Sequence, residues 1–308
     1  MTIYNERLDD ILIKEEYEKI EKYLKKINIE KEAKLKIAKG IKLPPEMNLY
    51  LFTAIPIILG AIYDSINIIN ASIASIIYIT PLFFKIWKTR RATAYYSSLT
   101  GSIYYRRESL EKIINGLLNI FYSSNIKIKE KGVIGLEISG DHVVLYPVYI
   151  NKNKNNIKEI ISKAVIDAIF SHEVSHLFFD SEKKASALGF LLYYKINKLF
   201  KHKKARKIVR ENVKRCVEYV INNKKYDDFS IGECYANIDL YRNDFSIDIN
   251  KEIEKLKYMN DRDIIEEVKK YAGVPYRTHF EYSLKHEYNR SLAEKIYKFF
   301  PFLINSLL

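Results

Sequence analysis

The sequence predicts a mostly helical α+β protein, in which an N-terminal helical hairpin precedes a larger domain with a small antiparallel sheet. Three observations support this. Apolar residues recur at helical spacing along most of the chain, three short β-prone runs lie between turn residues, and one long segment near the N-terminus is almost free of charge. The expected organisation is a charged helical segment at 1–46, the hairpin at 47–87 and the larger domain at 88–308.

Composition and charge fit a folded protein that meets an anionic partner. The chain has 308 residues, of which 48% are hydrophobic and 29% charged, with a net charge of +13. Such an excess suits nucleic acid or an anionic membrane surface. The densest basic run, Lys195 to Arg215, carries apolar residues at helical spacing and is predicted to be the solvated face of an amphipathic helix. No nucleic-acid-binding motif accompanies it, which argues against direct nucleic-acid binding.

The N-terminal segment and the cysteines give weaker indications. Apolar residues in the stretch 5–39 form one helical stripe, which is expected to pack on another domain or on a second copy of the chain. No cleavable signal peptide is expected, because the first residues are charged and no short apolar core follows them. Cys216 and Cys234 fit no CxxC metal or redox pattern, so a reduced cytosolic compartment is the default expectation.

Residues 47–87 are predicted to form a transmembrane hairpin. Asp64 divides an apolar run, Leu49 to Tyr63, from a second, Ala71 to Trp87. Arms of fifteen to eighteen helical residues span about 22 to 27 Å, which is short but serviceable against a hydrocarbon core of roughly 30 Å. Asp64 would then lie at the far interface, where its charge costs less than in the middle of the bilayer.

Lysines and arginines flank both arms, whereas the connection between the arms has none. By the positive-inside rule, both termini and the larger domain are therefore cytoplasmic. The alternative is a pair of buried helices in a soluble fold, which the short arms and the prolines Pro56 and Pro81 favour.

The larger domain begins with a predicted amphipathic helix, Arg107 to Tyr122. Three β-prone runs follow and are expected to form an antiparallel meander: Ile126 to Lys129, Val133 to Ser139, and His142 to Ile150. The next apolar pattern predicts a helix at Ile157 to Phe179.

The most specific motif, His172-Glu173-Val174-Ser175-His176, lies near the end of that helix. Residues four apart lie one above the other on a helix face, so both imidazoles can bind one Zn²⁺ while Glu173 stands beside the open coordination position. The apolar face of the helix continues in register to both histidines, which are therefore expected to point into the protein.

A catalytic zinc needs three protein ligands and a water. The predicted third ligand is Glu233, which opens a helical pattern and is followed by the small Ala236, where two helices can approach closely. Asn237, one turn further, is expected to orient a ligand or a histidine Nδ1. The alternative for Glu233 is an ordinary glutamate at a helix N-terminus, stabilised by the helix dipole.

Other carboxylates are weaker candidates for this ligand. Asp180 shares the face of the histidines and is expected to contact a ligand rather than the metal. Glu182 stands where the extended motif of another zinc peptidase class needs a third histidine, so that class is excluded. Glu211 and Glu218 lie in the basic helix and are expected to pair with lysine or arginine.

Together with the hairpin, these residues resemble the membrane-bound gluzincin peptidases, the family of the heat-shock protease HtpX and the CAAX prenyl endopeptidases. In that family a Glu-x-x-Ala-Asp motif supplies the third ligand, which Glu233 and Ala236 match, while Asn237 stands in place of the aspartate. Thr278-His279-Phe280 is similar to the family's Thr-His-Pro segment. The resemblance implies that His279 or Arg290 stabilises the oxyanion.

The resemblance also implies a zincin-like fold, in which the edge of a sheet beside the motif helix binds an extended substrate by strand addition. His142 to Ile150 is the candidate edge. The predicted activity is zinc-dependent hydrolysis of membrane-associated or unfolded polypeptides, with Glu173 as general base. The alternatives are a soluble zinc peptidase and a non-catalytic basic membrane adaptor. The sequence gives no indication of oligomeric state.

Overall fold

A computed structural model describes most of the predicted larger domain and part of the N-terminal segment. The described residues are 10–37, 92–98, 100–123, 131–138, 143–151, 156–223 and 226–273. The chain divides into two compact units, and all described residues except Gly273 belong to the first, which comprises 1–46 and 87–272. The hairpin predicted at 47–87 lies outside the described residues. Within the described ranges, no helix is both long and apolar enough to cross a membrane.

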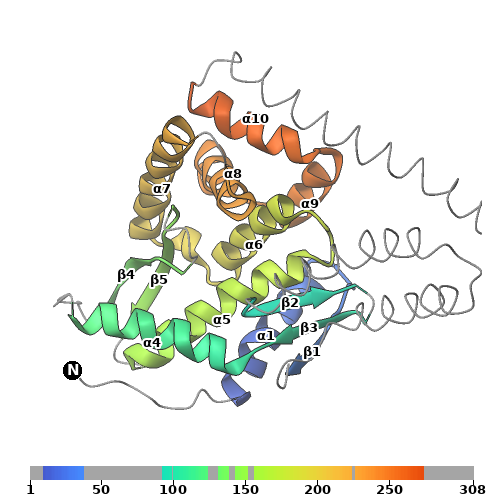
Figure 1. Cartoon of the computed structure of the whole chain (residues 1–308), viewed down its shortest axis with the longest axis vertical. Helices are drawn as coiled ribbons and strands as arrows, with labels where there is room; N and C mark the ends of the chain where they lie inside the picture. Colours follow the sequence, from blue (N-terminus) through green and yellow to red (C-terminus); the bar gives the residue numbers. More distant parts are fainter. Residues whose placement is uncertain are drawn as a thin grey trace, which may run out of the picture. The chain divides into compact units, whose positions relative to one another are not determined.

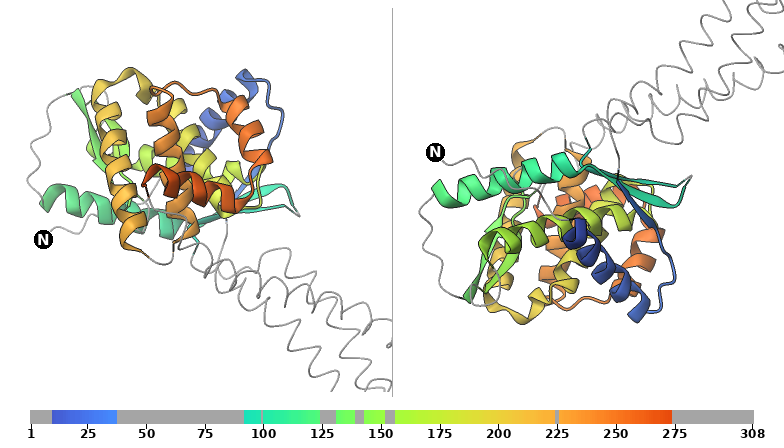
Figure 2. Two further views of the ribbon diagram at one scale, coloured as in Figure 1. Left: turned by 90° about the horizontal axis from the view of Figure 1, so that it is seen from above. Right: turned by 90° about the horizontal axis from the view of Figure 1, so that it is seen from below.

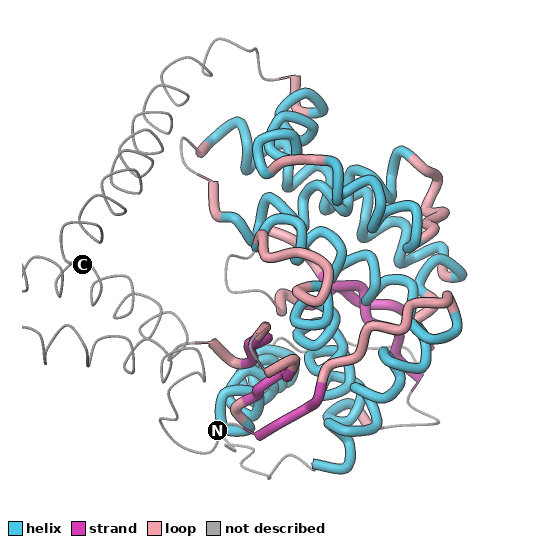
Figure 3. Tube along the Cα trace, turned by 90° about the vertical axis from the view of Figure 1, so that its right-hand side faces the viewer, coloured by secondary structure: helices cyan, strands magenta, loops and turns pink. Residues whose placement is uncertain are grey.

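Helices dominate the described chain and two small sheets accompany them, which confirms the mostly helical α+β class (Figures 1 and 3). The helices are α1 (Asp10–Lys26), α4 (Arg107–Ser123), α5 (Ile157–Ser175), α6 (Glu182–Ile196), the 3₁₀ turn η1 (Leu199–Lys201), α7 (Lys203–Asn222), α8 (Asp228–Arg242), α9 (Ile249–Tyr258) and α10 (Asp261–Tyr271). The strands are β1 (Lys34–Ile37), β2 (Ala94–Ser97), β3 (Ser102–Tyr105), β4 (Lys131–Leu136) and β5 (Tyr146–Asn151).

One sheet is mixed and the other antiparallel. The mixed sheet has the order β1-β3-β2, in which β1 runs parallel and β2 antiparallel to β3. Strands β4 and β5 form the second sheet, with Leu136 opposite Tyr146. Strand β4 overlaps the predicted run Val133 to Ser139 but begins two residues earlier, and β5 overlaps the predicted run His142 to Ile150 but ends one residue later. The run at 126–129 lies outside the described residues. The helix expected up to residue 39 ends at Lys26, and β1 follows it.

Helix α5 is the centre of the described fold. It packs against α6, α1, α4 and both sheets (Figure 2). The Asn156 side chain caps its N-terminus by accepting a hydrogen bond from the Glu159 N–H at 2.7 Å. The Phe170 ring is fully buried and meets Tyr17 of α1 edge to face, with ring centroids 5.7 Å apart. The apolar stripe of α1 is thus covered by α5.

Helix α8 is held between α6 and α7. Cys216 on α7 and Cys234 on α8 form a disulfide, with their Cα atoms 5.5 Å apart, and both side chains are fully buried. Reduced cysteines were expected from the sequence, because Cys216 and Cys234 fit no CxxC pattern, and the disulfide contradicts that expectation. This bond fixes α8 at the residue that follows Glu233.

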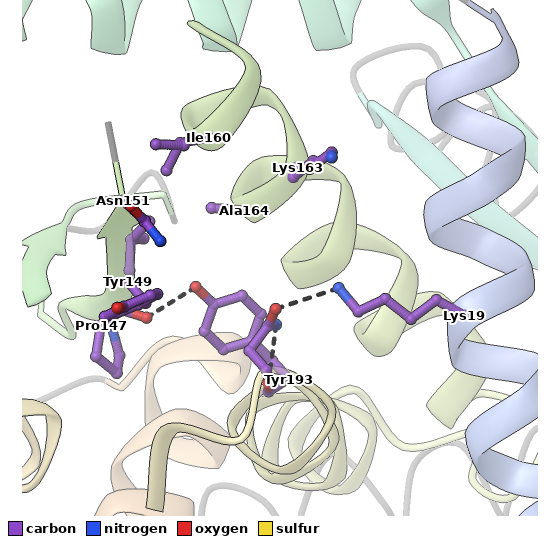
Figure 4. A pocket seen from close by; sticks show the side chains of 10 residues that line it. Lys19, Pro147, Tyr149, Asn151, Ile160, Lys163, Ala164 and Tyr193 are labelled. Carbon is purple, nitrogen blue, oxygen red and sulfur yellow. Dashed lines mark hydrogen bonds between the residues drawn. The ribbon is translucent and has the colours of Figure 1, made fainter. Parts of the chain in front are cut away.

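A cavity of about 390 Å³ lies where α1, α5, β5 and α6 meet (Figure 4). Lys19 lies at its edge and makes ion pairs with Asp167 at 2.5 Å and with Glu16 at 2.8 Å. The Lys19 ammonium also donates to the Asn197 side-chain oxygen at 3.2 Å. Asp167 is 1% exposed, so its charge depends on this ammonium. Pro147, Val148 and Tyr149 of the predicted substrate edge line the cavity, whereas none of the predicted metal ligands does.

Replacing Lys19 by Met is expected to lower the free energy of unfolding by about 2 to 4 kcal/mol, because removing one partner leaves a buried carboxylate uncompensated. Urea denaturation followed by circular dichroism measures this. The matched control is Lys14→Met, since Lys14 lies on the same helix and its contact with Glu18, at 3.9 Å, is exposed. Equal stabilities of the two variants would contradict the inference that Lys19 compensates the buried charge of Asp167. Adding Asp167→Asn to Lys19→Met should restore part of the lost stability.

Candidate metal centre

The two motif histidines lie together at the C-terminal end of α5. His172 is 7% exposed and His176 caps the helix. Their ring centroids are 4.9 Å apart and the ring planes are nearly perpendicular, at 87°. Both imidazoles therefore face the interior of the described fold, next to α6.

Each ring has a partner at its Nδ1 atom. The Nδ1 of His176 lies 3.0 Å from the carbonyl oxygen of Phe179, and the Nδ1 of His172 lies 3.3 Å from the Ser186 hydroxyl. A carbonyl oxygen only accepts, so the His176 Nδ1 is the donor. Such hydrogen bonds fix the orientation of a metal-binding histidine and leave its Nε2 for the metal.

The Nε2 atoms converge on the carboxylate of Glu182, the first residue of α6. His172 Nε2 lies 3.2 Å from Glu182 Oε1, and His176 Nε2 lies 3.8 Å from Glu182 Oε2. The three side chains offer donor atoms that all lie within 4.8 Å of one another. Zinc bonds of about 2.0–2.2 Å at tetrahedral angles place two ligand atoms about 3.3 to 3.5 Å apart, so this donor set fits one zinc ion.

Glu173 lies between the histidines in sequence and its carboxylate is buried. The backbone N–H of Tyr96, on β2, donates to Glu173 Oε2 at 2.7 Å and fixes its orientation. Burial raises the pKa of Glu173 to about 7, and the charge of Glu182 adds to the rise, whereas the charge of His172 and the Tyr96 N–H oppose it. The carboxyl group is therefore one that can take up and release a proton near neutral pH.

The histidines respond differently to the surrounding charges. Burial lowers the pKa of His172, but the hydrogen bond and charge of Glu182, with the charges of Glu173 and Glu233, more than offset this and leave the pKa raised. Burial and the charge of His172 lower the pKa of His176. The charges of three carboxylates thus act on His172 and favour positive charge at this point.

Glu233, the predicted third ligand, lies in α8, and its charge acts on His172, but among the described residues its carboxylate does not belong to the group of donor atoms formed by His172, His176 and Glu182. It lies one helical turn after Phe229 on the same helix, and the ring centroid of Phe229 lies 4.9 Å from that of His172. Glu233 is 1% exposed, and its Oε1 accepts a short hydrogen bond from the Tyr146 hydroxyl on β5. Burial raises the pKa of Tyr146 well above its ordinary value, so the hydroxyl stays a donor. Coordination by Glu233 stays a prediction.

Asn237 acts through the backbone. Its Nδ2 donates to the carbonyl oxygen of Glu233 at 2.9 Å, and its Oδ1 accepts from Asn212 at 2.9 Å. Asn212 in turn bonds both the N–H and the carbonyl of Leu145, the residue before Tyr146. This network connects α8 and α7 to the residue that precedes β5. The partners of the two histidine Nδ1 atoms are Phe179 and Ser186, so Asn237 holds the backbone of Glu233 instead of a histidine ring.

Two glycines determine how closely the helices α5, α6 and α8 pack around the candidate metal centre. A Cβ on Gly189 of α6 would lie 2.7 Å from the Cα of His172, and a Cβ on Gly232 of α8 would lie 2.2 Å from the carbonyl oxygen of Lys183. Contacts this short force the backbones apart. Only glycine therefore allows α6 to approach α5 and α8 this closely.

Gly189→Ala is expected to lower the free energy of unfolding by about 1 to 3 kcal/mol and to weaken zinc binding, because α6 carries both Glu182 and Ser186. Thermal unfolding and equilibrium dialysis with zinc measure the two effects. Gly116→Ala on α4 is the control: a Cβ there meets nothing within 4 Å, so its intrinsic helix preference should raise stability by about 0.5 to 1 kcal/mol. A Gly189→Ala protein as stable as this control would refute the close packing.

The remaining predicted residues fall into two groups. Asp180 is exposed in the turn between α5 and α6, and its charge acts on His176 and on Tyr96. His142, His279 and Arg290 lie outside the described residues. Sequence reasoning did not find the roles of Tyr96, Tyr146 and Ser186, which depend on how the sheets and α6 pack.

Comparisons of the chain with protein-family models, with curated proteins and with solved structures find no match. The likeness to the gluzincin peptidases therefore rests on the motif residues and on the hairpin predicted at 47–87. The geometry around His172 and His176 stands independently of it.

Proposed function

We propose that the chain is a zinc-dependent endopeptidase, held at a membrane by the hairpin predicted at 47–87, that hydrolyses membrane-associated or unfolded polypeptides. One observation carries this proposal: the Nε2 atoms of His172 and His176 converge beside the carboxylate of Glu182, while each Nδ1 has a hydrogen-bond partner. Glu173, between them on the same helix, has the buried and oriented carboxylate that a general base needs.

The proposed zinc ligands are His172, His176 and Glu233. The contact between Phe229 and His172 supports this choice, since it brings α8 against the histidine and Glu233 follows one turn later. Glu233 lies in the second turn of α8, beyond the first turn where a helix dipole alone would account for it. Zinc held there would supply a water with a pKa lowered toward 7 and would polarise the scissile carbonyl.

The chain's own residues perform the proton transfers. Glu173 takes the proton of the attacking water and passes it to the leaving amine. The Tyr96 N–H holds one oxygen of this carboxylate, so that the other can meet the water. The Tyr146 hydroxyl holds the Glu233 carboxylate in place, as partners of metal ligands commonly do.

Two sheet edges are candidates for binding an extended substrate. Strand β5, most of which lies in the predicted edge, pairs along its length with β4, and its first residue, Tyr146, contacts Glu233. Strand β2 is at the end of its sheet, and the Tyr96 N–H points away from β3 toward the general base. The edge of β2 therefore borders the general base, and because the Tyr96 N–H already bonds Glu173, a substrate strand would have to pair with other positions of β2.

The proposal is tested with the full-length chain in detergent and an unfolded, fluorescently labelled polypeptide as substrate. Cleavage that stops on adding a chelator and returns on adding Zn²⁺ is the expected result. Cleavage that continues in the presence of the chelator would contradict the proposal. Absence of cleavage by the zinc-loaded protein would contradict it as well. Recovery of the chain in the soluble fraction instead of the membrane fraction would favour the alternative of a soluble zinc peptidase.

A further inference from the structure

We propose that Glu182 is a fourth protein ligand of the same metal, one that closes the coordination sphere in the resting protein and leaves it when another ligand arrives. This inference rests on the proposed zinc site and concerns its regulation. Glu182 would be the residue that keeps the peptidase latent until a substrate competes for the metal.

The first support is the position of the carboxylate. Its two oxygens lie at 3.2 Å from His172 Nε2 and at 3.8 Å from His176 Nε2, one oxygen for each ring. These separations lie on either side of the value of about 3.3 to 3.5 Å expected for atoms that share a tetrahedral zinc. Each oxygen of this carboxylate thus faces one imidazole nitrogen, as shared coordination of a single ion requires.

The second support comes from the lone pairs. His176 donates through Nδ1 to the carbonyl oxygen of Phe179, so the Nε2 of the neutral ring carries a lone pair. This lone pair faces a carboxylate oxygen of Glu182, which also only accepts. Two acceptors facing each other repel unless a cation lies between them. A metal ion bound by both removes the conflict.

The third support is the contrast between a fixed backbone and an adjustable side chain. Ser181 caps α6, and the glycine contacts at Gly189 and Gly232 hold the helix against α5 and α8, so the Cα of Glu182 has little freedom. The Glu182 side chain is 31% exposed, so its carboxylate can turn toward solvent without moving the helix. Glu233, at 1% exposed and bonded to Tyr146, has no such route.

The consequence follows from counting ligands. His172, His176, Glu233 and Glu182 together make the four-ligand sphere that is typical of structural zinc, whereas hydrolysis needs an open position. The open form is therefore the one in which Glu182 has left. If it makes up about one tenth of the protein, any added ligand binds about tenfold more weakly than to a site without Glu182.

The experiment uses the full-length chain loaded with Co²⁺, whose visible absorption reports added ligands, and titrates acetohydroxamate, an anion, and imidazole, a neutral ligand. The variants are Glu182→Gln, which keeps the shape of the side chain and removes its charge, and Glu159→Gln, a first-turn glutamate of α5 as control. We expect Glu182→Gln to keep its metal and to bind both ligands about tenfold more tightly than wild type. Glu159→Gln should match wild type.

Three results would overturn the inference. Loss of metal from Glu182→Gln would make Glu182 an obligatory ligand. Tighter binding of acetohydroxamate alone would show a simple charge effect, and unchanged binding of both ligands would show that Glu182 does not coordinate. In each case wild type still binds metal, whereas failure of the proposed function would appear as wild-type protein that binds none.

Discussion

Replacing Glu173 by Gln is expected to reduce peptide hydrolysis by about 10²- to 10⁴-fold or more, because the amide cannot take the proton of the attacking water. The variant keeps the length of the side chain and can still accept the Tyr96 N–H through its oxygen. Zinc content should therefore remain that of wild type. Steady-state cleavage of a labelled unfolded polypeptide, together with metal analysis of the same sample, measures both.

The matched control for this variant is Glu159→Gln on the same helix, which removes one carboxylate far from the histidines and should leave activity unchanged. A Glu173→Gln protein that cleaves at the wild-type rate would exclude Glu173 as the base. If the zinc disappears as well, the loss of activity would instead report a damaged site.

Replacing Glu233 by Ala is expected to weaken zinc binding by more than about a hundredfold, since even the hydrogen-bond partners of metal ligands are worth about 10- to 100-fold. Tyr146→Phe removes such a partner and should lie within that range. Competition with a chromophoric chelator gives the affinities of both variants. Stability measured in the metal-free state separates loss of a ligand from loss of the fold.

The outcome also decides between the two carboxylates near the histidines. Zinc binding that survives in Glu233→Ala but fails in Glu182→Gln would assign the third position to Glu182. The sequence-based assignment of Glu233 would then be wrong.

Where helices are long and amphipathic, the sequence was sufficient to predict them. Helix α4 begins at Arg107 as predicted and ends at Ser123, one residue beyond its predicted end, and α5 begins at Ile157, directly after its Asn156 cap. In both, the apolar spacing and the local capping chemistry favour the same structure. The predicted end of α5 at Phe179 was too late, because the chain turns after Ser175 to start α6.

The mixed sheet could not be predicted in this way. Its strands have four residues each, and β1 pairs in parallel with β3, which is remote in the sequence. The alternation in Lys34–Ile37 is too short to outweigh the helical pattern before it. Whether such a segment becomes a strand depends on its pairing across the sheet, which depends in turn on tertiary packing.

The same division applies to the candidate site. His172, Glu173 and His176 were predictable because one helix fixes their spacing. The contacts of Glu182, Ser186 and Tyr146 come from α6 and β5, whose approach depends on Gly189 and on burial around α5. Helix α6 itself is buried on nearly all sides, so the spacing of its apolar residues does not show which neighbour each face meets.

The zinc content of the purified full-length chain, measured by elemental analysis for wild type, His172→Ala and His176→Ala, tests the central claim most directly. About one zinc per wild-type chain is predicted, with none retained by either variant after dialysis, because both imidazoles belong to one tetrahedral site. A wild-type chain that binds no zinc, or variants that bind as much as wild type, would contradict the account.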